Sequence, residues 1–331
     1  MKGYLEKLLS GQDLTEEEIG TAFERIMSGG ADDMEIAAFL VALRAKVESP
    51  AEIAGAAKVM RSKVNRVEVE IDVIDTCGTG GDGARTFNIS TAVAFVLAGA
   101  GHKVAKHGNR SVSSSSGSAD CLEALGIPIN LGPVEAARAI NEEGFAFLFA
   151  PNYHPSMKYA MPARKKLGIR TIFNVLGPLT NPAFASHQVI GVFSKNLVVP
   201  IAEVLKMLGL KCAMVVNSGM DEVSISGPTD FALLKGGAIT TGVIMPEDAG
   251  IERSSIDAIV VGNAGESAKI IEDVFSGRLG GPCLNAILIN AAAGFIVLDD
   301  AHDFRDGVDK ARSVIREGRA FEALNRARAV S

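Results

Sequence analysis

The chain has 331 residues, 47% of them apolar and 22% charged, and its formal net charge is −6. This composition excludes a disordered or fibrous chain and is typical of a globular protein with two domains, or with one large domain and an appendage. The acidic balance argues against a nucleic-acid-binding protein, because no basic stripe offsets it.

Cysteine spacing and the lengths of the apolar runs indicate the compartment. The four cysteines lie far apart and form no CxxC pair, which disfavours a zinc site or a redox motif and favours free thiols in a reducing cytosol. The longest apolar runs, 92–100 and 291–298, are too short and too interrupted by glycine to span a bilayer. We therefore expect a cytoplasmic protein with no membrane-spanning segment.

Residues 1–66 predict a small helical domain. Thr15 precedes three glutamates, which is typical of a capped helix start with acids in its first turn. Asp32 precedes a second amphipathic stretch, and Pro50 follows Ser49 where the first turn of another helix is expected. A basic helical segment from about 155 to 175 is expected to add to this domain.

Residues 67–331 predict a large α/β domain, because strand-like and helix-like patterns alternate along them. Such alternation indicates a mostly parallel central sheet flanked by helices. We expect strands over 67–73, 103–106, 145–150, 188–192, 213–217 and 256–261, and helices over 92–100, 135–142, 197–208 and 266–275.

A glycine-rich turn, DTCGTGGDG over residues 75–83, follows the first predicted strand. Four glycines within six residues let backbone N–H groups converge on an anion. Asn88, Ser90 and Thr91 are good N-cap residues for the next helix, whose N-terminus favours a phosphate. A tight turn that only leaves the strand is the alternative. The spacing fits neither the P-loop nor the GxGxxG dinucleotide motif.

A second motif, KVAKHGNRSVSSSSGSAD over residues 103–120, follows the next predicted strand. Its dense hydroxyl and amide groups suit the binding of phosphate and sugar oxygens, and a flexible serine-rich loop is the alternative. Arg164, on a basic helical stretch, reads by itself as part of a solvated face. Asp221 and Glu222 follow a predicted parallel strand, where a carboxylate pair can hold Mg²⁺ against phosphate oxygens.

Together these segments resemble the anthranilate phosphoribosyltransferase family, which shares the nucleoside phosphorylase-like fold. The matching pieces are DTCGTGGDG, TFNISTAVAFVLAGAG, KVAKHGNRSVSSSSGSADCLEALG, FLFAPNYHPSMKYAMPARKKLGIRTIFNVLGPLTNPA and DEVSISGPT. The resemblance implies a homodimeric enzyme of tryptophan biosynthesis with its active site between the two domains. It implies phosphoribosyl diphosphate and anthranilate as substrates and two Mg²⁺ ions per subunit.

The resemblance also implies a set of site residues. Those expected to bind phosphoribosyl diphosphate are Gly78, Gly81, Asp82, Thr86, Asn88, Ile89, Ser90, Thr91, Lys106, His107, Gly108, Asn109, Arg110, Ser111, Val112, Ser113, Ser114 and Ser118. Gly78, Asn109 and Arg164 would contact anthranilate, and Ser90, Asp221 and Glu222 would hold the metal ions. Lys106, His107 and Arg164 are the catalytic candidates, and His107 is expected either to handle a proton or only to position a substrate.

Two departures from the family pattern and two rival functions stay open. Ser115 stands where relatives usually carry lysine, and residues 216–220 lack the usual His-Gly pair. We expect both departures to affect substrate affinity more than activity.

A nucleoside phosphorylase of the same fold matches the serine loop in part, but it does not need the carboxylate pair. A non-catalytic relative that binds nucleic acid would need an extended basic stripe.

Overall fold

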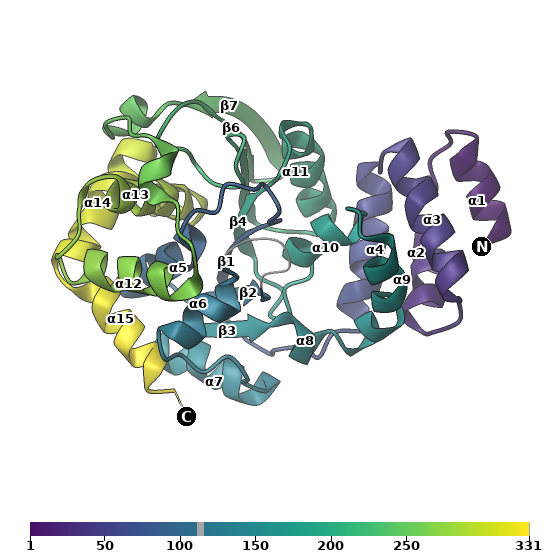
Figure 1. Ribbon diagram of the computed structural model, residues 1–331, viewed down its shortest axis with the longest axis horizontal. Helices are drawn as coiled ribbons and strands as arrows, with labels where there is room; N and C mark the ends of the chain where they lie inside the picture. The colour runs from purple at the N-terminus through teal and green to yellow at the C-terminus, as the bar shows by residue number, and fades with distance from the viewer. Residues whose placement is uncertain (111–115, 331) are drawn as a thin grey trace.

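In the computed structural model, which describes residues 1–110 and 116–330, a helical bundle stands beside a larger α/β domain (Figure 1). The bundle begins with α1 (Lys2–Leu9), α2 (Glu16–Met27), α3 (Asp33–Lys46) and α4 (Pro50–Ser62). Capping boxes start α2, α3 and α4 at Thr15, Asp32 and Ser49, where side chain and backbone bond reciprocally. The predicted helix starts are therefore confirmed.

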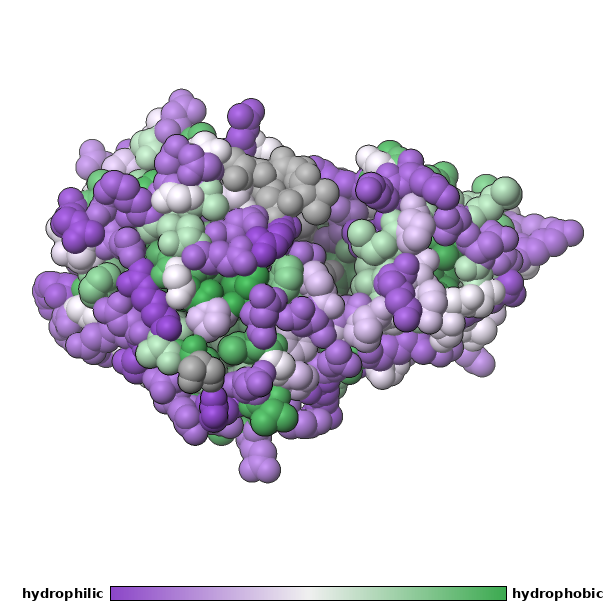
Figure 2. Space-filling view, turned by 60° about the horizontal axis from the view of Figure 1, so that its bottom comes forward, coloured by the Kyte–Doolittle hydropathy of each residue, from purple (hydrophilic) through white to green (hydrophobic). Residues whose placement is uncertain are grey.

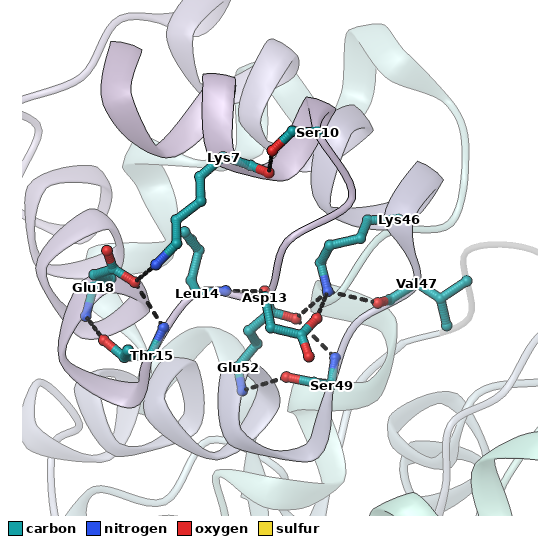
Figure 3. A network of polar contacts seen from close by, with 10 residues as sticks. All are labelled: Lys7, Ser10, Asp13, Leu14, Thr15, Glu18, Lys46, Val47, Ser49 and Glu52. Carbon is teal, nitrogen blue, oxygen red and sulfur yellow. Dashed lines mark hydrogen bonds and ion pairs between the residues drawn. The ribbon is translucent and has the colours of Figure 1, made fainter.

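One of these capping boxes is buried and joins two connections of the bundle (Figure 3). The fully buried Glu52 carboxylate accepts from Ser49 N at 2.8 Å and from Leu14 N at 2.9 Å. Lys46 Nζ donates to the same carboxylate at 2.8 Å and also pairs with Asp13. Glu52 thus fixes the α1–α2 connection against the α3–α4 connection.

The segment after β3 returns to the bundle. It contains a 3₁₀ turn, η1 (Pro155–Tyr159), and α9 (Met161–Leu167), which lies beside α3 in Figure 1. Ala160 and Ala163 are buried in the same apolar core as Phe39 and Leu40 of α3. The chain then passes through α10 (Phe173–Leu179), which lies between the bundle and the sheet.

The large domain is built on one seven-stranded sheet in the order β3-β2-β1-β4-β5-β6-β7. The first five strands along the chain pair in parallel, and β6 and β7 form an antiparallel hairpin against β5. The mostly parallel sheet is thereby confirmed. The strands are β1 (Ile74–Gly78), β2 (Val104–Gly108), β3 (Phe145–Phe149), β4 (His187–Gly191), β5 (Cys212–Asn217), β6 (Thr229–Lys235) and β7 (Ala238–Ile244).

Helices cover both faces of the sheet, and alternate strand residues enter different cores. Val189 of β4 joins the core formed with α5, α13, α14 and α15, whereas the adjacent Ile190 joins the core shared with α11 and the bundle. These helices are α5 (Ile89–Gly99), α11 (Val198–Met207), α13 (Gly281–Val297), α14 (Phe304–Arg316) and α15 (Arg319–Arg328). The shorter elements are α6 (Ser118–Ala124), α7 (Pro133–Glu143), α8 (Ala150–Tyr153), η2 (Lys195–Leu197), η3 (Pro246–Ala249), η4 (Ile256–Ile259) and α12 (Ala264–Phe275).

Two predicted strands are wrong. Residues 67–73 form no strand, because their polar contacts go to loops: Val67 N donates to Pro182 O at 3.0 Å. Residues 256–261 form η4 and a single bridge between Val260 and Thr86. In the part of the chain that the structure describes, no helix is long and apolar enough to cross a membrane.

Candidate active site

The candidate site lies where parallel strands end together. β1 ends at Gly78, β2 at Gly108, β4 at Gly191 and β5 at Asn217. Gly78 lies opposite Gly191, and Gly191 lies opposite Val216, one residue before the end of β5. Ligands of open α/β sheets bind outside the carboxyl ends of such strands. The two predicted motifs and the carboxylate pair therefore meet at one edge, although they are far apart in the sequence.

The glycine-rich turn after β1 needs glycine for its backbone. Gly80, Gly81 and Gly83 have φ angles of 67°, 77° and 81°, which other residues seldom adopt. Thr79 N donates to Gly191 O at 2.9 Å, and Thr79 Oγ1 accepts from Phe193 N at 3.0 Å. These two hydrogen bonds hold the turn against the end of β4. The N–H groups of its glycines therefore lie at the carboxyl edge of the sheet.

Asp221 lies against the ends of β1 and β4 through two very close approaches. A Cβ atom at Gly78 would lie 2.1 Å from Asp221 Oδ2, and one at Gly191 would lie 1.5 Å from Asp221 O. Asp221 Oδ2 accepts from Gly80 N at 2.7 Å. Behind it, Asn290 of α13 bonds both Val223 N and Val223 O, at 2.8 Å and 2.9 Å. The acidic segment is therefore held against the glycine turn from both sides.

Three carboxylates gather at this point without an equal number of cations. Asp82 Oδ2 accepts from Asp221 N at 3.3 Å, so the glycine turn carries its own acid to the pair. Burial, followed by the charge of Asp82, raises the pKa of Asp221 to about 7. Burial and then Asp221 raise the pKa of Glu222 well above its usual value. Such repulsion is what a bound cation relieves.

The groups at this edge fit Mg²⁺, because they are hard oxygen donors. Glu222 lies within reach of the Ser90 backbone N–H and of the Lys106 charge, both of which lower its pKa. In the described part of the chain no three His, Cys, Asp or Glu side chains form a metal cluster by themselves. A metal ion would therefore add the Ser90 hydroxyl, water or substrate oxygens to the two carboxylates.

Lys106 is a buried cation at the end of β2, only 1% exposed. Its ammonium donates to Thr76 O and, at 3.2 Å, to Ser90 Oγ. Burial lowers the pKa of Lys106 and raises that of the neighbouring Asp75, and the opposite charge of each partner offsets both shifts. Lys106 thus joins β1, β2 and the start of α5.

The predicted cap at the start of α5 has an unexpected arrangement. Asn88 is the N-cap residue, but its side chain makes no capping hydrogen bond. Instead its Oδ1 accepts from Ser116 Oγ at 2.5 Å and from Ser267 Oγ at 2.7 Å. Ile89 and Thr91 are buried in the first turn of α5, so their expected contacts with a substrate would come from the main chain.

His107 packs against a second histidine, His154, that the sequence analysis did not single out. The two Nε2 atoms are 3.3 Å apart, and His107 Nδ1 donates to Gly177 O at 3.1 Å. Burial lowers the pKa of His107 to about 3 and that of His154 to about 4. Both imidazoles are therefore neutral at pH 7, which favours a positioning role for His107 over proton transfer.

The serine motif is described only at its two ends. Asn109 O accepts from Ser118 Oγ and from Ala119 N, both at 3.3 Å. Gly108 has no room for a side chain, because a Cβ atom would lie 2.2 Å from Ser118 Oγ. The predicted substrate contacts of Ser111, Val112, Ser113 and Ser114, and the departure at Ser115, lie outside the described residues.

Arg110 and Arg164 differ in what surrounds their guanidinium groups. Arg110 pairs with Asp120 at 2.8 Å and with Glu123 at 2.5 Å, so its expected contact with the substrate would come from its backbone. Arg164 lies 4.9 Å from the Phe173 ring centroid and has no carboxylate partner among the described residues. Burial lowers its pKa. A half-buried, uncompensated guanidinium suits a ligand carboxylate.

The recess between the bundle and the large domain is visible in Figure 2. Arg170, between α9 and α10, links the two sides: its guanidinium donates to Gly81 O, and Arg44 of α3 donates to Arg170 O. Sequence reasoning missed His154 and Arg170, although both lie in the matching segment 147–183, because no local pattern marks them there. It missed Gly191 because that residue lies outside the matching segments. Only the strand-end position of Gly191 would have signalled a close approach.

Comparison with known proteins agrees with this architecture. A family model described as the glycosyl transferase family helical bundle domain matches residues 2–64, and the α/β domain of the same family matches residues 70–321. Fold and site thus define a two-domain glycosyltransferase.

Full-length relatives narrow this class. Anthranilate phosphoribosyltransferase of Symbiobacterium thermophilum is 48% identical over 99% of this chain and 97% of its own, and that of Desulfatibacillum aliphaticivorans is 49% identical over 97% and 95%. The chain belongs to the anthranilate phosphoribosyltransferase family.

Solved structures lead to the same assignment. The crystal structure from Thermus thermophilus has a TM-score of 0.93 and 39% identity, and covers 99% of this chain and 98% of its own. The Saccharomyces cerevisiae enzyme in complex with PRPP and Mg has a TM-score of 0.91 and 30% identity, over 98% and 95%. Its complex with 4-fluoroanthranilate has a TM-score of 0.89 and 29% identity, over 98% and 96%.

Proposed function

We propose that the enzyme transfers the phosphoribosyl group of 5-phosphoribosyl 1-diphosphate to the amine of anthranilate. The products are N-(5-phosphoribosyl)anthranilate and diphosphate, in a step of tryptophan biosynthesis. The observation that carries the proposal is the meeting of a glycine turn with Asp221 and Glu222 at one sheet edge. An anion cradle beside a cluster of buried acids suits a diphosphate bound with a divalent cation.

The donor would lie over the glycine turn and the start of α5. In this arrangement Gly81, Asp82 and Thr86 belong to the turn, and Asn88, Ser90 and Thr91 begin the helix whose N-terminus favours phosphate. Lys106, already bonded to Ser90 Oγ, supplies a buried positive charge at the same place. These groups stabilise the negative charge that gathers on the leaving diphosphate as its bond to C1 lengthens.

Ser90, Asp221 and Glu222 would hold two Mg²⁺ ions per subunit. Mg²⁺ would neutralise charge on the diphosphate. The yeast relative's complex with PRPP and Mg and the raised pKa of both carboxylates support this assignment. Asp82 and the main chain of Val223 keep the two acids in place by the contacts described above.

Anthranilate would bind through Arg164 and Asn109, with Gly78 where the two substrates meet. Arg164 has no internal carboxylate partner among the described residues, so the acceptor's carboxylate would compensate its charge. An aromatic amine is unprotonated at neutral pH, so the reaction needs positioning more than it needs a base. Neutral His107, fixed by Gly177 O, fits such a site.

Product analysis tests the reaction against its nearest rival. The purified enzyme should form diphosphate and phosphoribosyl anthranilate in equal amounts from phosphoribosyl diphosphate and anthranilate. A nucleoside phosphorylase would instead consume inorganic phosphate and a pyrimidine nucleoside. Phosphorolysis without any diphosphate release would overturn the proposal.

We also propose that the enzyme is a cytoplasmic homodimer. Leu9 of α1 and Met34 of α3 are 76% and 80% exposed on neighbouring helices of the bundle, and Val47 follows α3 at 71%. Exposed apolar side chains on α1 and at the two ends of α3 favour burial against a second copy. All four cysteines are free thiols, which suits the cytosol. Light scattering during gel filtration should give twice the chain mass, and a monomer at micromolar concentration would contradict the dimer.

A further inference from the structure

Ser267, in the first turns of α12, is a fully buried residue that contacts the proposed donor site from a distant part of the chain. It lies 179 positions after Asn88 and bonds that residue twice. Asn88 N donates to Ser267 Oγ at 2.8 Å, and Ser267 Oγ donates to Asn88 Oδ1 at 2.7 Å. One hydroxyl thus bonds the backbone N–H of the α5 N-cap residue, as the N3 side chain does in a capping box, and also binds the Asn88 side-chain amide.

The hydrogen-bonding capacity of this hydroxyl is used fully. A serine hydroxyl has one donor and two acceptor positions. Its proton goes to Asn88 Oδ1, one lone pair accepts from Asn88 N, and the other faces Cys121 Sγ at 3.5 Å. The Cys121 thiol is therefore the donor in that contact.

The Asn88 amide is held in one of its two orientations by these contacts. Its oxygen accepts from two hydroxyls, those of Ser116 and Ser267, and its NH₂ group faces Ser116 O, which can only accept. A reversed amide would set its own oxygen against that carbonyl and would leave the Ser267 proton without this acceptor. The NH₂ group makes only a long bond of 3.3 Å to Ser116 O among the described residues. Asn88 is half-buried at the N-terminus of α5, so this orientation presents an N–H donor where an anion is expected.

We propose that Ser267 is a positioning residue that keeps the Asn88 amide turned with its NH₂ group toward the diphosphate of the donor. A reversed amide would present a carbonyl oxygen to the phosphate and repel it. The inference rests on the proposed function only in naming the diphosphate as the bound anion. The orientation itself comes from the Ser267 hydroxyl proton and from the Ser116 carbonyl, which only accepts.

A double-mutant cycle between Ser267→Ala and Asn88→Ala tests this role. Ser267→Ala should raise the KM for phosphoribosyl diphosphate about tenfold and leave the KM for anthranilate within about twofold. In the Asn88→Ala background the same change should add less than about twofold. Equal changes in both KM values, or full additivity in the double variant, would overturn the proposal.

A conservative variant and a matched control separate positioning from folding. Ser267→Cys, kept reduced, retains a weak donor and should restore part of the lost donor affinity. Ser276→Ala, which removes a hydroxyl bonded to Glu272 O at the other end of α12, should leave both KM values unchanged. If Ser267→Ala lowers the melting temperature without changing the donor KM, Ser267 is structural and the proposal is wrong.

Binding of inorganic diphosphate with Mg²⁺, measured by calorimetry, tests the role of Ser267 without using anthranilate. Its result therefore does not depend on whether anthranilate is the acceptor. The Ser267→Ala change should weaken diphosphate binding about tenfold. A wild type that binds diphosphate but does not consume anthranilate would contradict the proposed reaction, and the Ser267 comparison would still be decided by the calorimetry.

Discussion

At the scale of single residues, the site is marked by charges that lack partners within the protein. Arg164 has no carboxylate beside it among the described residues, and Asp221, Glu222 and Asp82 gather with too little positive charge. Both charge imbalances lower the stability of the folded state, because a buried charge without a partner costs free energy. A bound ligand of opposite charge would remove this cost. The two imbalances have opposite signs, which suits an acceptor carboxylate and a cation-bound diphosphate.

Removing the guanidinium of Arg164 should affect the acceptor alone. We expect Arg164→Ala to raise the KM for anthranilate tenfold or more, because a carboxylate would lose its charge-assisted hydrogen bonds. The KM for phosphoribosyl diphosphate should change less than about twofold. Steady-state kinetics with each substrate varied in turn measures both. Arg164→Lys keeps the charge but not the two-point hydrogen bonding of a guanidinium, so its KM for anthranilate should lie between those of the wild type and Arg164→Ala. Equal effects on the KM values of both substrates would contradict the assignment of Arg164 to anthranilate.

The raised pKa of Asp221 predicts a pH-dependent cost to stability in the metal-free enzyme. The folded state keeps a proton on Asp221 up to about pH 7, whereas the unfolded carboxyl loses it near pH 4. The folded state therefore binds more protons between these values, and its stability falls as the pH rises through this window.

Asp221→Asn removes this titration and should stabilise the metal-free protein. We expect its melting temperature to exceed that of the wild type by about 3 °C or more at pH 8, with a smaller difference at pH 5. Thermal unfolding in chelator at both pH values measures this. The variant should also lose most of its Mg²⁺-dependent turnover. A variant less stable than the wild type at pH 8 would show that the folded state does not disfavour the ionised form of the Asp221 carboxyl.

At the scale of secondary-structure elements, a glycine at the end of a strand allows the acidic segment at Asp221 to pack against the sheet. β4 ends at Gly191, whose missing side chain leaves room for the main chain of Asp221. A Cβ atom there would overlap a carbonyl oxygen, which cannot move without shifting the acidic segment. The position of the carboxylate pair thus depends on a residue in a different strand.

Gly191→Ala should therefore weaken the binding of Mg²⁺ that the reaction needs. We expect at least about a hundredfold loss of kcat/KM at limiting Mg²⁺, partly recovered at high Mg²⁺, because the carboxylates are displaced. Initial rates over a Mg²⁺ series provide the measurement. Gly227→Ala, where the added Cβ meets nothing within 4 Å, is the control and should behave as wild type. Unchanged Mg²⁺ dependence in Gly191→Ala would contradict this account of the strand end.

The buried capping box of α4 predicts a large effect on stability with little effect on chemistry. Glu52→Gln should destabilise the protein by about 3 kcal/mol, because it leaves Lys46 buried with a weaker partner. Denaturant unfolding measures this loss, and kcat should stay near that of the wild type. Glu18→Gln is the matched control: Glu18 also closes a capping box and pairs with a lysine, but its side chain is 31% exposed. Equal losses in the two variants would show that burial is not what matters.

The elements predicted from the sequence were those whose local signals agree with their packing. Thr15, Asp32 and Ser49 begin helices as expected because the capping residues and the apolar faces coincide. The alternation over 67–73 failed because no neighbouring strand pairs with it. The hairpin of β6 and β7 was missed because its partly exposed residues lack a continuous buried run.

At the scale of the whole molecule, the site is assembled from both domains and from three parts of the large one. Linear motifs predicted the glycine turn, the ends of the serine motif and the acidic pair. They did not predict the residues that hold these pieces together, such as Arg170, His154, Asn290 and Ser267, because each makes contacts across more than forty positions of sequence. Such contacts become visible only when the sheet and the bundle are in place.

The central claim is that donor, metal and acceptor meet in this one site. The most direct test follows the fluorescence of anthranilate with the purified enzyme, with and without phosphoribosyl diphosphate, Mg²⁺ and a chelator. We predict that fluorescence is lost only when donor and free Mg²⁺ are present together, and that added chelator stops the loss. Unchanged fluorescence under all conditions, in enzyme that still binds the donor, would contradict the assignment of anthranilate as the acceptor.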